Sequence, residues 1–177
     1  HGVLGRGTTD NIGDDPLEVS MVTDIDFAAG ERVRFISTAT MPSACVVMDS
    51  GGVRCWGDGS NGQLGSSAAY IDTLGGSTDI VFENDEAVID LAAGDRHNCA
   101  LFADGAVRCW GDNSSGQCGQ ETTASDIGTS AAEMATLPRV PFADDMAAVK
   151  RVYAGGDHSC VLTVDNAVKC WGDNTDN

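Results

Sequence analysis

The sequence predicts an all-β repeat protein, and three observations support this. One pattern occurs three times: a cysteine opens an alternating apolar strand, a tight turn follows, and a second strand ends in Cys-Trp-Gly-Asp. The copies span residues 45–58, 99–112 and 160–173. All three tryptophans and six of the seven cysteines lie in these copies, so the repeat is the unit of architecture. The 22 glycines, together with few long helical patterns, favour turns and short strands.

Each copy is predicted to form a β-hairpin. In the second copy Asp104-Gly105 stands between two alternating apolar runs, which is a strong hairpin signal. With Gly105 in a left-handed bulge, residues 98–102 pair with residues 106–110. Asn166 replaces this glycine in the third copy, and asparagine is the residue next best suited to positive φ. The register then places cysteines opposite one another: Cys45 with Cys55, Cys99 with Cys109, and Cys160 with Cys170.

Directly opposed cysteines suit cross-strand disulfides, because opposed Cα atoms lie about 4.5 Å apart, near the lower limit of disulfide geometry. Three such bonds imply an oxidising compartment, so we expect a secreted or cell-surface protein. Metal binding is the alternative. Two copies could each supply three ligands: His97, Cys99 and Cys109, or His158, Cys160 and Cys170.

The disulfide interpretation is preferred over the metal site for two reasons. Ser43 breaks the histidine pattern in the first copy, and the ligand spacing is not that of a zinc ribbon. His97 and His158 are therefore interpreted as core residues that donate to the backbone of a neighbouring repeat.

Cys118 is the unpaired cysteine. The preferred interpretation is a small buried apolar residue, and the alternative is a free or intermolecular thiol. Asn113-Ser-Ser115 is a formal glycosylation sequon, but its asparagine belongs to the repeat motif and is expected to point inward.

Basic residues recur at one position of the repeat. Arg54, Arg108 and Lys169 each precede the tryptophan by two residues, so both side chains point to the same side of the strand. The structural interpretation is a cation packed beside the indole and paired with a neighbouring aspartate. The functional alternative is a basic stripe for an acidic ligand. The net charge of −17 favours the structural interpretation.

The repeated pattern resembles the regulator of chromosome condensation repeat. The second copy carries it most fully, in Ala93, Gly94, His97, Asp104, Gly105, Trp110, Gly111, Asn113, Gly116 and Gln117. Trp56 and Trp171 occupy the tryptophan position in the other copies. The resemblance implies a β-propeller of four-stranded blades, with about seven blades in a closed ring. Three repeats would form an incomplete ring or a segment of a larger repeat array.

The organisation follows from the repeat boundaries. Residues 1–35 are read as the tail of a preceding repeat plus a linking strand, 36–87 as repeat 1, 88–148 as repeat 2, and 149–177 as the first half of repeat 3. Each connection between copies is expected to add one short strand. In the second connection residues 137–140 resemble an edge strand, because proline is tolerated there, and residues 133–135 are too short for a helix.

The two ends look complementary. Residues 1–9 match the tail of a repeat, whereas residues 170–177 stop where such a tail should begin. The chain begins at His1 and not at methionine, so we expect a processed or partial product. The ends suggest a homo-oligomer or polymer in which one copy meets the next head to tail, as a ring or a filament.

Composition excludes several partners. A net charge of −17 and a pI near 4.1 argue against nucleic acid and anionic membranes, which such a chain would repel. No window has the length and apolarity of a membrane-spanning helix, so membrane insertion is not expected.

No catalytic or cofactor motif is evident, and the chain is not expected to be an enzyme. No metal or cofactor is expected either. Acidic clusters at residues 14–15, 24–26, 83–86 and 144–145 could hold calcium, but none has a recognised loop spacing, and solvated surface charge is the preferred interpretation.

The sequence therefore predicts a non-enzymatic extracellular structural or interaction repeat protein. One alternative is a secreted binding module, such as an enzyme inhibitor or adhesin. The other is an exchange-factor-like regulator of a small GTPase, since the resembling family includes nucleotide-exchange factors.

Overall fold

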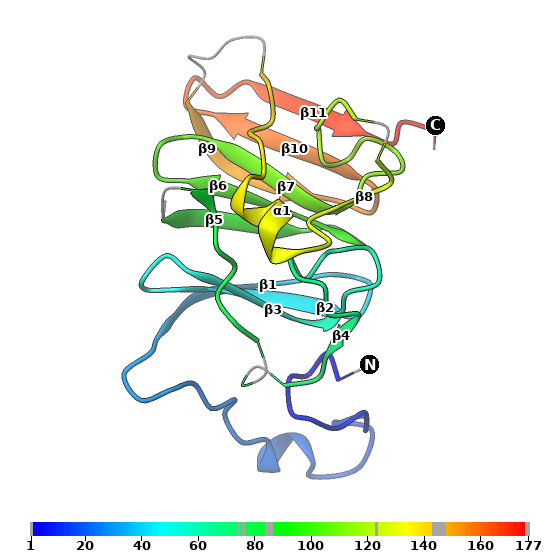
Figure 1. Cartoon of the computed structure of the whole chain (residues 1–177). Coiled ribbons are helices and arrows are strands. Elements are labelled where there is room, and N and C mark those ends of the chain that lie inside the picture. The colour runs from blue at the N-terminus through cyan, green and yellow to red at the C-terminus, as the bar shows by residue number, and fades with distance from the viewer. Residues whose placement is uncertain are drawn as a thin grey trace.

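Three antiparallel sheets follow one another along the chain, which confirms the all-β prediction (Figure 1). The structure is a computed structural model that describes residues 2–73, 75, 77–83, 87–122, 124–142 and 148–175. Each sheet is called a blade. In Figure 1 the N-terminal segment lies at the bottom, and blades 1, 2 and 3 lie above it in sequence order.

The blades share one strand plan. Blade 1 contains β1 (Val33–Thr38), β2 (Ser43–Met48), β3 (Val53–Asp58) and β4 (Tyr70–Ile71), hydrogen-bonded in that order. Blade 2 repeats the order with β5 (Val88–Ala93), β6 (His97–Phe102), β7 (Val107–Asp112) and β8 (Asp126–Ile127). Blade 3 has β9 (Val149–Ala154), β10 (His158–Thr163) and β11 (Val168–Gly172).

The hairpin register is the predicted one. Each pair of cysteines stands directly opposite across the second and third strands of its blade. The turns use positive φ where expected, at 89° for Gly51, 86° for Gly105 and 65° for Asn166. Local turn chemistry therefore sets the register, and the register determines which side chains share a face.

The second connection differs from the sequence prediction. Residues 137–140 are not a strand, and the fourth strand of blade 2 is β8 instead. Val140 still donates its backbone N–H to the Val107 carbonyl at 2.8 Å, but the preceding proline has no N–H to extend a ladder. The region expected to be too short for a helix contains one turn, α1 (Ala131–Ala135), capped by the Ser130 hydroxyl.

The N-terminal layer, defined as residues 2–32, covers the lower side of blade 1. It has one short 3-10 helix, η1 (Val19–Met21). Val3, Ile25 and Phe27 pack against a small cluster of buried side chains from β2 and β3 that includes Trp56. The larger core runs between the blades and joins all three.

Close packing around Gly94, in the loop between β5 and β6 of blade 2, generates a stability prediction. A Cβ on Gly94 would lie 2.2 Å from Cε1 of His97 and 2.5 Å from the backbone oxygen of Gly155 in blade 3. We expect Gly94→Ala to lower the free energy of unfolding by about 2–3 kcal/mol, because a rigid backbone atom must move. Gly75→Ala is the control, since nothing lies within 4 Å of its added Cβ. Urea unfolding of both variants measures the difference, and equal stabilities would contradict the packing.

Candidate functional site at the blade junctions

Each tryptophan ties its blade to the segment that precedes it. Nε1 of Trp110 donates to the carbonyl oxygen of Gln63 at 3.0 Å, and Nε1 of Trp171 donates to that of Gln117 at 2.8 Å. Each acceptor lies in the Gly-Gln tail of the preceding repeat. The indole therefore satisfies its buried N–H with a backbone group of its neighbour, and the junction between blades acquires a fixed register.

The N-terminal layer supplies the same contact to blade 1. Nε1 of Trp56 donates to the carbonyl oxygen of Val3 at 2.7 Å. Val3 thus takes the position that the glutamine holds at the other two junctions. The next residue, Leu4, is 45% exposed, whereas its equivalents Leu64 and Cys118 are 2% and 0% exposed. The layer therefore resembles the tail of a repeat that would precede blade 1, and the described residues do not include the strands of such a repeat.

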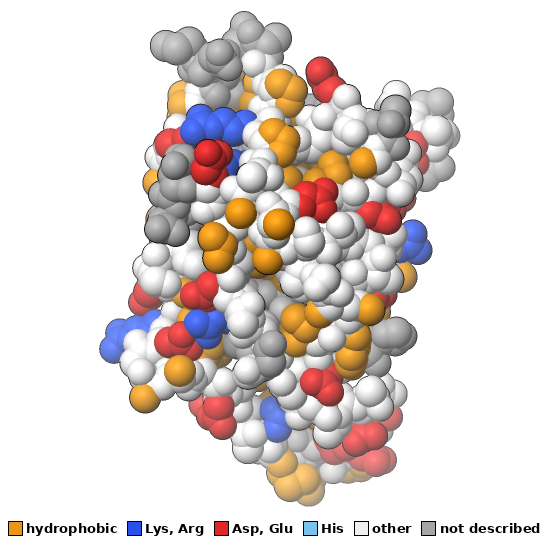
Figure 2. Space-filling view, in the orientation of Figure 1, with side chains coloured by type: hydrophobic (Ala, Val, Ile, Leu, Met, Phe, Trp, Pro, Cys, Tyr) orange, Lys and Arg blue, Asp and Glu red, His pale blue; other side chains and the backbone are white. Residues whose placement is uncertain are grey.

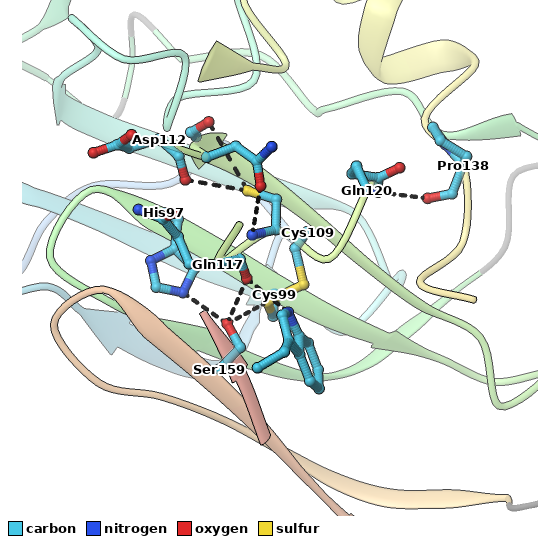
Figure 3. Close-up of a disulfide and its surroundings, with 12 residues drawn as sticks. His97, Cys99, Cys109, Asp112, Gln117, Gln120, Pro138 and Ser159 are labelled. Carbon is cyan, nitrogen blue, oxygen red and sulfur yellow. Dashed lines mark hydrogen bonds between the residues drawn. A yellow bond between two sulfur atoms is a disulfide. The ribbon is translucent and has the colours of Figure 1, made fainter. Parts of the chain in front are cut away.

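A second donor reaches the same carbonyl at both inner junctions, and Figure 3 shows the junction between blades 2 and 3. Nδ2 of Asn98 donates to Gln63 at 2.9 Å, and the Ser159 hydroxyl donates to Gln117 at 2.9 Å. Nε2 of His97 lies 2.8 Å from the Ser159 oxygen. Because the hydroxyl hydrogen is directed to Gln117, His97 must be the donor from Nε2, and its Nδ1 carries the lone pair.

His97 is neutral in this junction. Burial lowers its pKa to about 4, and its Nδ1 has no hydrogen-bond partner among the described residues. Serine and histidine at hydrogen-bond distance resemble part of a catalytic triad, but Ser159 and His97 are only 0% and 1% exposed and cannot meet a substrate. The hydrogen bond between His97 and Ser159 instead joins blade 2 to blade 3.

The two predicted core histidines differ in their surroundings. His97 is buried, and its partner is a side chain of the next blade and not a backbone group as predicted. His158 occupies the equivalent position in blade 3 and is exposed, so it is not a core residue in this structure.

Two of the three recurrent cations, Arg108 and Lys169, lie against aromatic rings, but these rings are not the indoles. The guanidinium carbon of Arg108 is 4.9 Å from the ring centroid of Phe102, and Nζ of Lys169 is 5.7 Å from that of Phe142. A phenyl face attracts a cation by the same quadrupole as an indole face. The aromatic contact was predictable in kind, whereas the identity of the ring was not.

Arg54 has the predicted aspartate partner and one more acid. Its guanidinium lies 2.6 Å from Asp79 and 2.5 Å from Glu31. The hydrogen bond from Arg54 lowers the pKa of Glu31, and the same contact raises the pKa of Arg54. Glu31 precedes blade 1 and Asp79 follows it, so Arg54 joins both linkers to the middle of the blade.

A repeated phenylalanine in the linkers was not identified from the sequence. Phe82 packs against Phe102 and Trp110, with centroids 4.9 and 5.7 Å apart, and Phe142 packs against Trp171 at 5.6 Å. Phe27 contacts the cluster around Trp56. The signal was an apolar residue two positions before a phenylalanine, in Ile25-Asp-Phe27, Ile80-Val-Phe82 and Val140-Pro-Phe142.

All three predicted disulfides are present, Cys45–Cys55, Cys99–Cys109 and Cys160–Cys170. The six paired cysteines are therefore not zinc ligands in this structure.

Cys118 is fully buried, and burial raises the pKa of its thiol, so an intermolecular bond from the folded chain is unfavourable. Asn113 is also buried and donates to the Ala124 carbonyl, which keeps the sequon amide away from solvent.

The acidic clusters show no metal site in the part of the chain that the structure describes, where no group of three His, Cys, Asp or Glu could hold an ion. The clusters at residues 83–86 and 144–145 lie mostly outside the described residues. Across the same described part, no helix has the length and apolarity to cross a membrane.

No described residue covers the outer face of blade 3, which carries its cystine. In blades 1 and 2 the cystine face is buried, with Val53 0% and Val107 1% exposed. The equivalent Val168 is 66% exposed, and Tyr153 of the same face is 53% exposed. At one end of blade 3, Asp95 of the β5–β6 loop, His158 and Trp171 are among the residues that line a hollow of about 820 Å³. Blade 3 thus presents to solvent a surface that its siblings bury.

Models of the regulator of chromosome condensation (RCC1) repeat match residues 88–117 and 149–177, and residues 104–162. Together they cover residues 88–177, just over half of the chain. The chain belongs to the RCC1 repeat family. It is 33% identical over 129 residues to human "Probable E3 ubiquitin-protein ligase HERC6", covering 73% of this chain and 12% of that protein. It is 28% identical over 173 residues to "Protein pim1" of Schizosaccharomyces pombe, covering 97% of this chain and 29% of that protein.

Solved RCC1-type structures share the fold. Yeast RCC1 (Prp20), solved with Kap60 bound, has a TM-score of 0.69 and 21% identity over 85% of this chain and 32% of its own. Human WBSCR16 has a TM-score of 0.66 and 22% identity over 83% of this chain and 34% of its own. The chain spans less than a third of pim1 and about an eighth of HERC6, so the similarity concerns the repeats. The chain is therefore a segment of such a propeller.

The junction histidine generates a pH prediction. Between pH 6.5, the ordinary pKa of histidine, and about pH 4, the side chain of His97 is protonated in the unfolded chain and neutral in the folded chain. Stability is therefore complete above pH 6.5 and falls as the pH drops through this window, by up to about 3 kcal/mol. In His97→Gln this part of the pH dependence disappears. Chemical unfolding at pH 7, 5.5 and 4 measures it, and exposed His158→Gln is the control that should retain it. If the free energy of unfolding of His97→Gln falls with pH as steeply as that of the unmodified chain, the burial of neutral His97 is contradicted.

Proposed function

We propose that this chain is a non-enzymatic extracellular interaction module, and that the uncovered face of blade 3 is its docking surface. The observation that carries the proposal is the contrast in exposure between Val168 and its buried equivalents Val53 and Val107. An apolar sheet face of this kind is normally covered by another protein surface. The partner is a protein, a class that includes a further copy of the same chain.

The extracellular setting is supported by the three disulfides, since such bonds persist in oxidising compartments. The net charge of −17 favours solubility and disfavours nucleic acid as a direct partner. A structural or adhesive role and inhibition of a secreted enzyme both fit a docking face with exposed apolar side chains such as Val168 and Tyr153.

An exchange-factor-like regulator of a small GTPase is the second candidate. It is favoured by the shared fold with Prp20p of Saccharomyces cerevisiae, whose structure was described together with its binding to Gsp1p and histones. The disulfides disfavour it, because a cytosolic or nuclear protein would hold these cysteines as thiols. The redox state of the protein in its native cells separates the two candidates.

The test compares two valine variants as bait. The chain, Val168→Asp and Val81→Asp are immobilised without reductant and exposed to the extracellular fraction of the source cells. Val81 is the matched control, because it is 57% exposed in the linker between blades 1 and 2. We expect a stoichiometric protein to be retained by the chain and by Val81→Asp, and to be lost with Val168→Asp, because a buried aspartate is costly. Equal retention by all three, or native protein with free thiols in the cytosol, would overturn the proposal.

A further inference from the structure

We propose that Asn61 is a self-modification site, at which the backbone nitrogen of Gly62 converts the side-chain amide to a carboxylate and weakens the junction between blades 1 and 2. The site lies in the tail of blade 1, defined as residues 59–65, and is independent of the blade 3 face. The proposal follows from the residue order in this tail, from the hydrogen bonds that hold Asn61, and from the carboxylate of Asp126 that faces it.

Asn61-Gly62 is the only Asn-Gly pair in the sequence. The backbone nitrogen that follows an asparagine is able to attack its side chain, and glycine presents this nitrogen with no side chain in the way. Packing requires glycine here, because Gly62 has a φ of 80° and an added Cβ would lie 2.8 Å from the carbonyl oxygen of Ile127 in β8. The equivalent pair in blade 2 is Ser115-Gly116, which has no amide to convert.

The step is a substitution at Cγ of Asn61. The Gly62 nitrogen loses its proton to solvent and bonds to Cγ, the Cγ–Nδ2 bond breaks, and Nδ2 leaves as ammonia. The product is a five-membered cyclic imide, which water opens at either carbonyl. One opening gives aspartate, and the other gives isoaspartate, in which the main chain runs through Cβ and Cγ. One water is consumed and one ammonia is released, so this thermal reaction of asparagine needs no further reagent.

Two side chains act on the reacting amide in opposite directions. The Ser60 hydroxyl donates to Oδ1 of Asn61 at 3.3 Å, where negative charge develops when Cγ is attacked. Asp126 of β8 accepts from Nδ2 at 3.0 Å, and its carboxylate disfavours the same negative charge. The Gly62 N–H also donates to the Gly59 carbonyl at 3.0 Å, which holds the attacking nitrogen in place. The docked junction therefore slows the reaction, and separation of the two blades speeds it.

Conversion replaces a hydrogen bond with a repulsive contact. A carboxylate at position 61 has no proton to donate to Asp126, and two ionised acids at this distance repel one another. The isoaspartate product also adds one atom to the main chain two residues before Gln63. The Gln63 carbonyl accepts from Trp110 at 3.0 Å and from Asn98 at 2.9 Å, and both bonds depend on its position. The modification thus acts on the contact that sets the register between blades 1 and 2.

The first test follows conversion of each asparagine in the folded chain at neutral pH by peptide mass spectrometry. We expect Asn61 to convert before any other asparagine, and more slowly than in the urea-unfolded chain. Ser60→Ala should slow conversion about two- to tenfold, and Asp126→Asn should speed it about tenfold. The Asp126→Asn effect should vanish in urea, because Asn61 and Asp126 are 65 positions apart and meet only in the folded chain. Asn61→Gln is the unreactive control, since its longer side chain would have to close a six-membered ring.

The second test measures what conversion does to the fold. Asn61→Asp reproduces one product and should lower the urea midpoint of unfolding. Adding Asp126→Asn should restore the midpoint, because the amide then donates from β8 to the carboxylate of the tail. Val81→Asp is the control for added charge, since Val81 is 57% exposed, and it should leave the midpoint unchanged.

Three results would overturn the proposal: Asn61 still intact in the folded chain after the unfolded chain has fully converted, equal conversion rates for the folded chain and Asp126→Asn, or a midpoint of Asn61→Asp equal to that of the unmodified chain. These measurements involve no partner protein. Their failure therefore leaves the proposed docking role of the blade 3 face standing, and failure of the valine bait experiment leaves Asn61 conversion standing.

Discussion

The structure depends on one constraint: a blade of this size cannot bury its two apolar faces without a neighbour on each side. The tryptophan N–H and a backbone carbonyl of the preceding tail fix how that neighbour sits, at Trp56–Val3, Trp110–Gln63 and Trp171–Gln117. Disulfides hold each hairpin, but they act within a blade. Cohesion along the array comes from apolar burial between blades, and its register from this repeated hydrogen bond.

The hairpins and their disulfides were predictable from the sequence because they depend on local chemistry. Asp104-Gly105 determines a turn, the turn determines the register, and the register brings cysteines together at fixed spacing. The junctions were less predictable because they join residues far apart in the chain. His97 meets Ser159, and Phe142 meets Lys169, through packing that no local spacing encodes. The fourth strand of blade 2 was misplaced at residues 137–140, where proline prevents a continuous ladder.

The two ends of the array are chemically unlike. The N-terminal layer seals blade 1, so that Val46 and Trp56 are buried as deeply as residues between blades. Blade 3 has no such cover among the described residues, and His158 is exposed where His97 is enclosed. The candidate site is therefore a face that no described residue covers, although its equivalents in blades 1 and 2 are buried. Sequence repetition indicated the equivalent faces, but only the burial of equivalent residues showed that Val168 is exposed where Val53 and Val107 are buried (Figure 2 shows one side of the molecule).

The most direct test of this account is the rate at which each disulfide of the native chain is reduced by a small dithiol, followed by alkylation and peptide mass spectrometry. Thiol–disulfide exchange requires access to the sulfur atoms. The account predicts that Cys160–Cys170 is reduced at least about tenfold faster than Cys45–Cys55 and Cys99–Cys109 at concentrations where the chain is monomeric. Equal rates for all three bonds, or slowest reduction of Cys160–Cys170, would contradict an uncovered blade 3 face.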